Sequence, residues 1–140
     1  MDTFRKEERL NSKILINQLF EQGAYITIFP FRCVWMEADL ASDHLVQMAI
    51  SVSKKKFKRA VDRNKVKRLI REAYRKNKGV LTEELNRQQK KCILLFIYTG
   101  NTIVLYPEFE SKIILTLQRL IKEMEARVMA GKVSGENDTT

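Results

Sequence analysis

Residues 92–98 read Cys-Ile-Leu-Leu-Phe-Ile-Tyr, an almost wholly apolar run in a chain of 140 residues. A strand with one face in water alternates apolar and polar side chains, whereas a strand covered on both faces is apolar throughout. The run therefore predicts a central strand of a sheet, with other layers packed on both sides. It is far too short to cross a bilayer, and the 44% apolar content excludes a wholly disordered chain.

The rest of the chain predicts helices and further strands around this central strand. Apolar residues recur at helical spacing in some segments, while β-branched and aromatic residues concentrate in others. Pro30 indicates a sheet edge or a bulge within its segment. The predicted order is helix 10–22, strand 25–36, strand 45–52, helix 62–78, strand 92–98 and a helix from 108 through 128, with Gly23 and Gly79 closing the first two helices and one further helical turn within 80–89.

This order predicts an α+β protein, an α/β sandwich of a small mixed sheet packed with helices. One more short strand could be present. The residue pattern does not predict the handedness of the connection between the parallel strands of the sheet. A chain of 140 residues fits one domain, which we place at residues 1–130. Residues 131–140 are small and polar, and they predict a disordered tail.

The cysteines and the N-terminus favour a cytoplasmic protein. Cys33 and Cys92 lie in apolar, strand-like runs without a neighbouring Cys or His, so we expect buried thiols of a reducing compartment. The N-terminal segment MDTFRKEERL lacks the apolar core of a signal peptide.

The sequence offers little chemistry for a protein nuclease. Such an enzyme needs a cluster of carboxylates for two metal ions, or a histidine as general base. His44 is the only histidine and lies in a turn-like segment, and the acidic pairs have the pattern of solvated loop and helix residues. We therefore expect neither catalytic nor metal-binding side chains in this chain.

Half of the positive charge lies in one short segment, residues 54–78. The segment holds 13 of the 26 Lys and Arg residues against only Asp62 and Glu72, so its charge is +11 (13 − 2) and that of the rest is −2 (13 − 15). Such a patch repels itself, and an anionic partner offsets that cost; nucleic acid is the polyanion that fits best. On a helical wheel one face carries Arg63, Asn64, Lys67, Arg68, Arg71, Arg75 and Lys78, and the approach to the helix adds Lys54, Lys55, Lys56, Lys58 and Arg59.

These residue types suit contacts with an RNA backbone. Arginine makes paired hydrogen bonds to phosphate, lysine supplies point charge, and Asn64 can contact a 2′-hydroxyl or a base edge. The alternative is a solvated charged face, which is disfavoured because few acids stand four residues away to neutralise it. Charge alone does not separate RNA from DNA. A DNA-binding architectural protein ranks lower because no helix-turn-helix spacing precedes the basic helix.

The basic segment also carries a specific signature. The strand-like Ile50-Ser51-Val52-Ser53-Lys54-Lys55 is followed by the pattern Arg-Asn-x-x-Lys-Arg-x-x-Arg at Arg63, Asn64, Lys67, Arg68 and Arg71. This combination closely resembles the protein subunit of bacterial ribonuclease P. The resemblance covers about residues 4–128, and residues 50–75 are its specific core.

The resemblance implies a fold and a set of partners. The family's sandwich has an unusual left-handed βαβ crossover. Its signature helix and the preceding loop bind a catalytic RNA subunit, which implies RNA-binding roles for Lys54, Lys55, Lys56, Lys58, Arg59, Arg63, Asn64, Lys67, Arg68, Arg71 and Arg75. The RNA, with Mg²⁺ bound mainly by the RNA and its substrate, removes the 5′ leader of precursor tRNA. The chain is thus expected to be a component of an endoribonuclease whose protein side chains are not catalytic.

In the family a cleft between the first helix and the sheet binds the single-stranded leader. The first helix there commonly carries two aromatic residues four positions apart, and here Phe20 matches the second while Ile16 occupies the first. Phe31, Arg32 and Trp35 are further candidates for this cleft, with core packing as the alternative for each.

Two other functions stay open at this point. One is a ribosome-associated or other structured-RNA binder without a role in tRNA processing, which would ignore the leader. The other is a protein-only nuclease, which would cleave RNA without an RNA subunit. We expect neither a membrane nor DNA as a partner.

Overall fold

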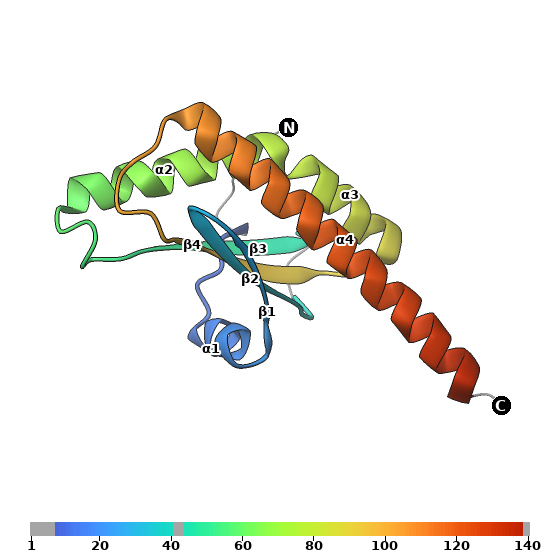
Figure 1. Cartoon of the computed structure of the whole chain (residues 1–140). Coiled ribbons are helices and arrows are strands. Elements are labelled where there is room, and N and C mark those ends of the chain that lie inside the picture. The colour runs from blue at the N-terminus through green and yellow to red at the C-terminus, as the bar shows by residue number, and fades with distance from the viewer. Residues whose placement is uncertain (1–7, 41–43, 139–140) are drawn as a thin grey trace.

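The computed structural model describes residues 8–40 and 44–138, the last eight of these through their backbone alone. Four strands and four helices follow one another along the chain (Figure 1). Their order is α1 (Lys13–Gln22), β1 (Ala24–Ile28), β2 (Phe31–Glu37), β3 (Val46–Val52), α2 (Ala60–Asn77), α3 (Gly79–Gln88), β4 (Cys92–Tyr98) and α4 (Tyr106–Asp138).

The strands form one mixed sheet in the order β1-β2-β4-β3. Strand β4 is antiparallel to β2 and parallel to β3, and six of its seven residues are buried. The apolar run is therefore an inner strand covered on both faces, as its composition predicts. The α+β class and the small mixed sheet are confirmed.

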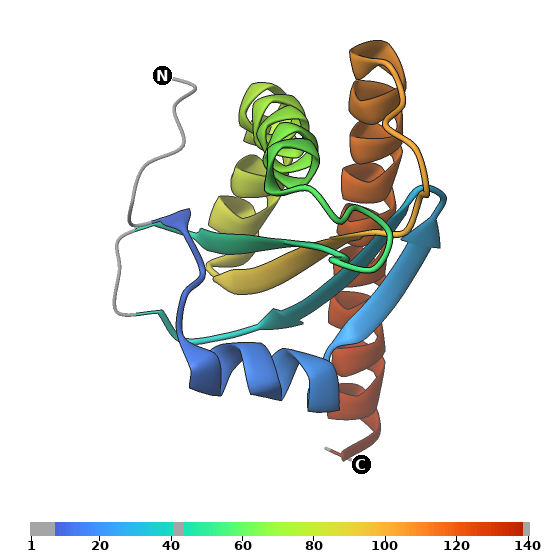
Figure 2. The ribbon, with the colours of Figure 1, turned by 90° about the vertical axis from the view of Figure 1, so that its left-hand side faces the viewer.

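Helices cover the two faces of the sheet unequally (Figure 2). On one face α2, α3 and α4 pack over alternate strand residues such as Phe31, Phe96 and Tyr98, and Phe109 of α4 stacks on Tyr98 with ring centroids 5.4 Å apart. On the other face α1 is the one helix of the described chain, and it covers a smaller apolar cluster. In this cluster Leu19 packs against strand residues whose side chains point away from the main core, such as Val34 and Leu95. Part of this second face is consequently not covered by a helix.

The crossover from β3 through α2 and α3 to β4 is left-handed. Seen from the helices with both strands pointing up, β4 lies to the left of the parallel strand β3 (Figures 1 and 2). Most βαβ crossovers are right-handed, so the arrangement agrees with what the family resemblance implies. It does not follow from the hydrophobic pattern.

Several predicted boundaries are wrong. The segment 25–36 forms two strands joined by a tight turn at Phe29-Pro30, and these pair as a hairpin. Gly79 does not close α2 as a terminator, because Lys78 keeps helical dihedral angles and the chain continues directly into the ten-residue helix α3. The helix α4 runs to Asp138, past residue 128 to which we predicted it, and its proline, Pro107, lies in the first turn.

Candidate nucleic-acid interface

The basic helix α2 lies across the sheet through a narrow apolar stripe. Val66, Ile70, Ala73 and Tyr74 are buried at the spacing of successive helical turns. The helix begins after Arg59 without a side-chain cap, and Asp62 in its first turn is the one acid placed there. The opposite side of the helix faces away from the core and carries the signature residues.

Three cations of the signature form neither an ion pair nor a side-chain hydrogen bond with any residue in the described part of the chain. They are Lys67, Arg68 and Arg71, of which the last two are exposed, and Asn64 is exposed beside them. Electrostatic repulsion among them is therefore not relieved within these residues. This is the arrangement expected of a surface that binds phosphate groups.

Arg75 differs from these residues because it is held by an acid one turn away. Its guanidinium donates two hydrogen bonds to Glu72, at 2.6 and 3.1 Å. These bonds hold the pKa of the Glu72 carboxyl below its usual value. Lys76 lies 3.9 Å from the same carboxylate. Much of the charge of Arg75 is thus neutralised within the protein.

The segment 53–59, which we call the basic loop, is an ordered turn. The hydroxyl of Ser53 accepts hydrogen bonds from the backbone N–H groups of Lys55 and Lys56. Phe57 is buried against Tyr98, with ring centroids 5.9 Å apart, and anchors the loop to the core. The five cations of the loop, Lys54, Lys55, Lys56, Lys58 and Arg59, are all exposed.

Arg63 connects α2 to this loop. Its guanidinium donates hydrogen bonds to the carbonyl oxygens of Phe57 and Lys58, at 2.8 and 2.9 Å. The side chain therefore braces the basic loop against the first turn of α2, a role that the signature alone does not reveal. Lys78 does not lie on the exposed basic face where the helical wheel placed it. It is buried, and its amine lies 2.6 Å from a carboxylate oxygen of Glu8.

A groove continues the signature face over the edge strand β3. Lys67 and Arg71 line one side of it, and Arg9 and Asn11 of the N-terminal segment line another, around a volume of about 370 Å³. The N–H of Leu10 donates to the carbonyl of Met48 and fixes this segment to β3. The groove leads from the α2 side of the sheet toward the α1 side.

The α1 side holds some of the predicted leader-binding residues and excludes others. Phe20 is 50% exposed, Arg32 is exposed, and Ile16 is partly buried against the smaller core cluster. Phe31 and Trp35 point to the opposite face and are fully buried. Their assignment to the cleft is therefore wrong, because in β2 they alternate with Arg32 and Val34 and belong to the main core.

Tyr25 is a candidate on this face that sequence reasoning missed. It is 42% exposed on β1, and the Arg32 guanidinium carbon lies 4.8 Å from its ring centroid. Tyr25 is paired with Val34 and its neighbour Thr27 with Arg32, which puts all four on the α1 side. Successive side chains of a strand point to opposite faces, and this alternation in β1 and β2 is the sequence signal that could have identified Tyr25.

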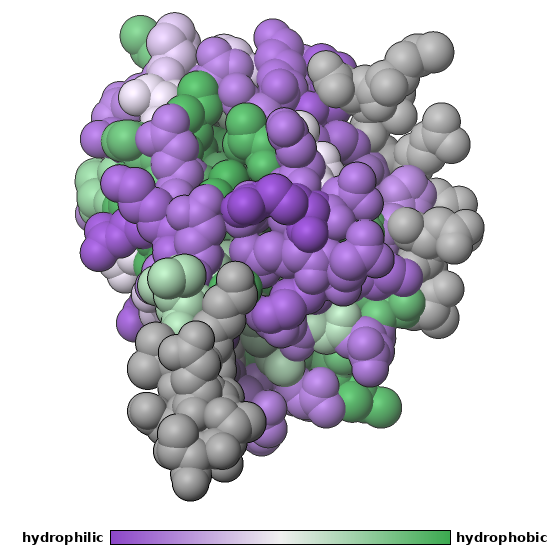
Figure 3. Space-filling view, turned by 90° about the vertical axis from the view of Figure 1, so that its right-hand side faces the viewer, coloured by the Kyte–Doolittle hydropathy of each residue, from purple (hydrophilic) through white to green (hydrophobic). Residues whose placement is uncertain are grey.

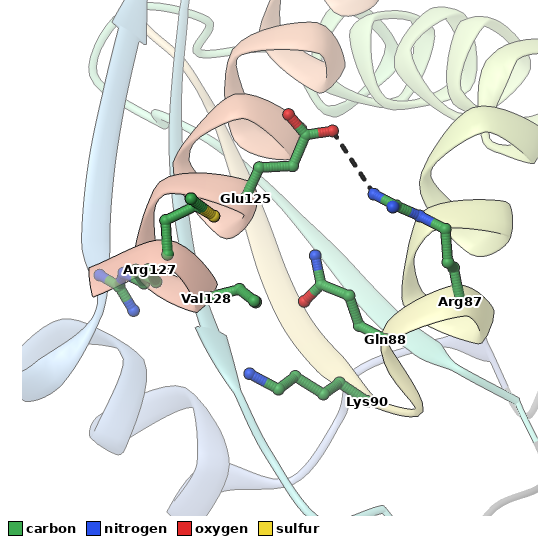
Figure 4. Close-up of a pocket in the computed structure, with 7 residues that line it drawn as sticks. Arg87, Gln88, Lys90, Glu125, Arg127 and Val128 are labelled. Carbon is green, nitrogen blue, oxygen red and sulfur yellow. Dashed lines mark ion pairs between the residues drawn. The ribbon is translucent and has the colours of Figure 1, made fainter. Parts of the chain in front are cut away.

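A cavity larger than the groove over β3 lies elsewhere, between the end of α3 and α4. Its volume is about 870 Å³, and Arg87, Gln88, Lys90 and Glu125 are among its lining residues (Figure 4). Arg87 is paired with Glu84 and lies 3.6 Å from Glu125, so much of its charge is neutralised locally. Figure 3 shows that this side of the molecule is hydrophilic over most of its described surface. The cavity contains none of the signature residues.

Candidate metal ligands are dispersed over the described part of the chain. Among residues 8–40 and 44–138 no three His, Cys, Asp or Glu side chains lie close enough to hold a metal ion. His44 lies 3.8 Å from Glu8. These residues therefore do not fit a Mg²⁺ site made by the protein alone. Within the same ranges, no helix is both long and apolar enough to cross a membrane.

An exposed cationic surface on a mixed sheet is typical of a nucleic-acid-binding protein of the α+β class. A family model described as Ribonuclease P matches residues 4–102. The chain belongs to this family, that of the bacterial ribonuclease P protein component. A member of this family is a component of a ribonucleoprotein endoribonuclease and takes part in 5′ processing of precursor tRNA. Membership therefore implies that an RNA subunit is the partner of this chain.

Individual relatives agree with the family model. The ribonuclease P protein component of Porphyromonas gingivalis is 37% identical over 131 residues, which cover 91% of this chain and 87% of that protein. The protein component of Chlorobaculum tepidum is 37% identical over 98 residues, which cover 65% and 64%. Among solved structures, the RNase P protein from Thermotoga maritima matches with a TM-score of 0.65 at 24% identity, over 80% of this chain and 96% of that one. A Staphylococcus aureus RNase P protein matches with a TM-score of 0.64 at 19% identity, over 82% and 89%. These structural matches support the fold.

Proposed function

We propose that the catalytic RNA subunit binds the signature face of α2 together with the basic loop. The observation that carries this proposal is a set of cations without acidic partners, the half-buried Lys67 and the exposed Arg68 and Arg71. They lie beside a loop of five exposed cations that Arg63 braces through two hydrogen bonds. Because the loop is already ordered, binding RNA costs little conformational entropy there. Arg63 and Arg75 belong to the same surface, but their side chains are bonded to the loop carbonyls and to Glu72 respectively. The proposed contacting residues are Lys54, Lys55, Lys56, Lys58, Arg59, Asn64, Lys67, Arg68 and Arg71.

The salt dependence of RNA binding tests this surface. Each phosphate contact that is lost lowers the slope of log K against log salt by about one unit. Arg68→Gln should therefore weaken binding of the catalytic RNA and flatten this slope, measured by filter binding over a range of KCl concentrations. Lys122→Gln is the matched control, because it removes the charge of an exposed lysine on α4. Equal slopes for Arg68→Gln and the wild-type protein would contradict the assignment.

The 5′ leader of precursor tRNA is proposed to bind the uncovered face beside α1. Phe20, Tyr25 and Arg32 are exposed there, and Ile16 adds apolar surface. An aromatic ring can stack on an unpaired base, for about 1–3 kcal/mol per base. Arg32, which lies over the Tyr25 ring, supplies positive charge for the leader backbone. This face lies across the sheet from α2, so leader and catalytic RNA need not compete for it.

The leader face is tested in the reconstituted holoenzyme. Tyr25→Ala and Phe20→Ala should each reduce the preference for precursor over mature tRNA, while binding of mature tRNA stays unchanged. Val80→Ala removes an exposed apolar side chain at the start of α3 and serves as control. A preference equal to that of the wild-type enzyme in both variants would place the leader elsewhere.

In this proposal the catalytic RNA carries out the hydrolysis, and Mg²⁺ is held by RNA and substrate. The protein contributes affinity: its cations lower repulsion between RNA segments, and its leader face selects the precursor. We place this reaction in the cytoplasm.

A further inference from the structure

Phe29 is an aromatic side chain that neither the core nor the leader face uses. It lies in the turn between β1 and β2 and is 68% exposed, more than any other aromatic residue of the described chain. An isolated exposed apolar side chain is common on proteins. The surroundings of Phe29 set it apart from that ordinary case.

Two hydrogen bonds connect the turn that carries Phe29 to the basic loop. The N–H of Thr99, just after β4, donates to the carbonyl of Pro30 at 2.8 Å. The carbonyl of the same Thr99 accepts a hydrogen bond from the Lys56 amine at 2.6 Å. The turn, the end of β4 and the basic loop therefore meet at one end of the sheet, as both ribbon views show (Figures 1 and 2).

This arrangement has the composition of a site for an unpaired nucleotide. Such sites combine cations that follow the backbone with an aromatic ring on which a base stacks, and any base can stack. The ring here is carried by a turn that backbone bonding holds in place, so little entropy is lost when a base stacks on it. A protein bound at this place would have to bury the five cations of the basic loop, which is costly. This disfavours a protein as the partner of Phe29.

We propose that Phe29 is a stacking platform for an unpaired base of the catalytic RNA, whose neighbouring phosphates are bound by the basic loop. The proposal rests on the function proposed above and adds a stacking contact with a base to a surface that otherwise acts mainly through its cations. It also extends the RNA footprint from α2 to the β1–β2 turn.

Affinity for the catalytic RNA at several salt concentrations tests the proposal. Phe29→Ala should weaken binding about fivefold or more, with the slope of log K against log salt unchanged because no cation is lost. Phe29→Trp should keep or increase the affinity, since the larger ring still stacks. Met129→Ala is the matched control, because Met129 is 61% exposed near the far end of α4. Unchanged thermal midpoints would show that the variants remain folded.

The outcomes separate this inference from the proposed function. If Arg68→Gln weakens binding and flattens the slope while Phe29→Ala binds like the wild-type protein, the RNA surface stands and the stacking site is overturned. If Phe29→Ala leaves RNA affinity intact but abolishes self-association of the free protein in sedimentation, the ring belongs to a protein interface and the proposal is again overturned. If the wild-type protein does not bind the RNA, both proposals fall.

Discussion

At the scale of single residues, Arg63 supports the proposed RNA surface from below, through its hydrogen bonds to the basic loop. Its guanidinium is engaged by the carbonyl oxygens of Phe57 and Lys58, whereas Arg68, a turn and a half further along α2, is exposed. Both belong to the same signature, yet only Arg68 has its full hydrogen-bonding capacity available to a phosphate. The two arginines should therefore respond differently to substitution.

Replacing Arg63 should loosen the basic loop even in the absence of RNA. Arg63→Gln removes one or both bonds to the loop carbonyls, so we expect faster amide hydrogen exchange in residues 54–59 of the free protein. Arg68→Gln should leave that exchange unchanged. Equal exchange in wild type and Arg63→Gln would show that the loop is held by Phe57 and Ser53 alone.

The two thiols should be inert in the folded protein. Burial raises the pKa of Cys33 well above its ordinary value and that of Cys92 to about 12. The reactive thiolate is therefore scarce at pH 8, and both sulfurs are shielded from reagents. We expect no rapid reaction with a disulfide reagent at pH 8, and two reactive thiols after unfolding in guanidinium. Rapid modification of either thiol in the native protein would contradict the described packing.

At the scale of elements, the end of α1 depends on a close approach to β2. A Cβ added at Gly23 would lie 2.4 Å from the carbonyl oxygen of Leu19 and 2.6 Å from a methyl carbon of Val34. The chain turns there from the helix directly into β1, with the Gly23 N–H donating to Leu19. This packing positions the leader face, because Ile16 and Phe20 lie on α1.

Gly23→Ala should destabilise the protein by about 1–3 kcal/mol, the usual cost of forcing an extra carbon into a packed site. Gly79→Ala is the control, since no atom lies within 4 Å of its Cβ and its site is the first residue of α3. An alanine there should be neutral or stabilise by up to about 1 kcal/mol. Urea unfolding of both variants measures the difference, and equal midpoints would contradict it.

Local patterns predict most elements but not the contacts that refine the site. The apolar run 92–98 and the stripe of Val66, Ile70 and Tyr74 identify β4 and α2, because each is a property of neighbouring residues. The bond between Lys78 and Glu8 joins residues 70 positions apart, and no local pattern reports it. The same holds for the bond from Lys56 to Thr99, which places the basic loop beside the β1–β2 turn.

At the scale of the whole molecule, the sheet separates the two surfaces that we propose to bind RNA. The signature face of α2 covers one side, and the leader face beside α1 lies on the other (Figure 2). The left-handed crossover follows from the family resemblance rather than from any residue pattern, since the pattern of β3, α2 and β4 suits either hand. The groove over the edge strand β3 lies between these two surfaces, and Arg9, Lys67 and Arg71 line it with positive charge.

Cleavage of a precursor tRNA that carries a 5′ leader tests the central claim most directly. The purified protein is assayed with and without its cognate RNA subunit at near-physiological Mg²⁺, and the RNA subunit is also assayed alone. The account predicts efficient release of the leader only when protein and RNA are combined. Cleavage by the protein alone, or a rate with both components equal to that of the RNA alone, would contradict it.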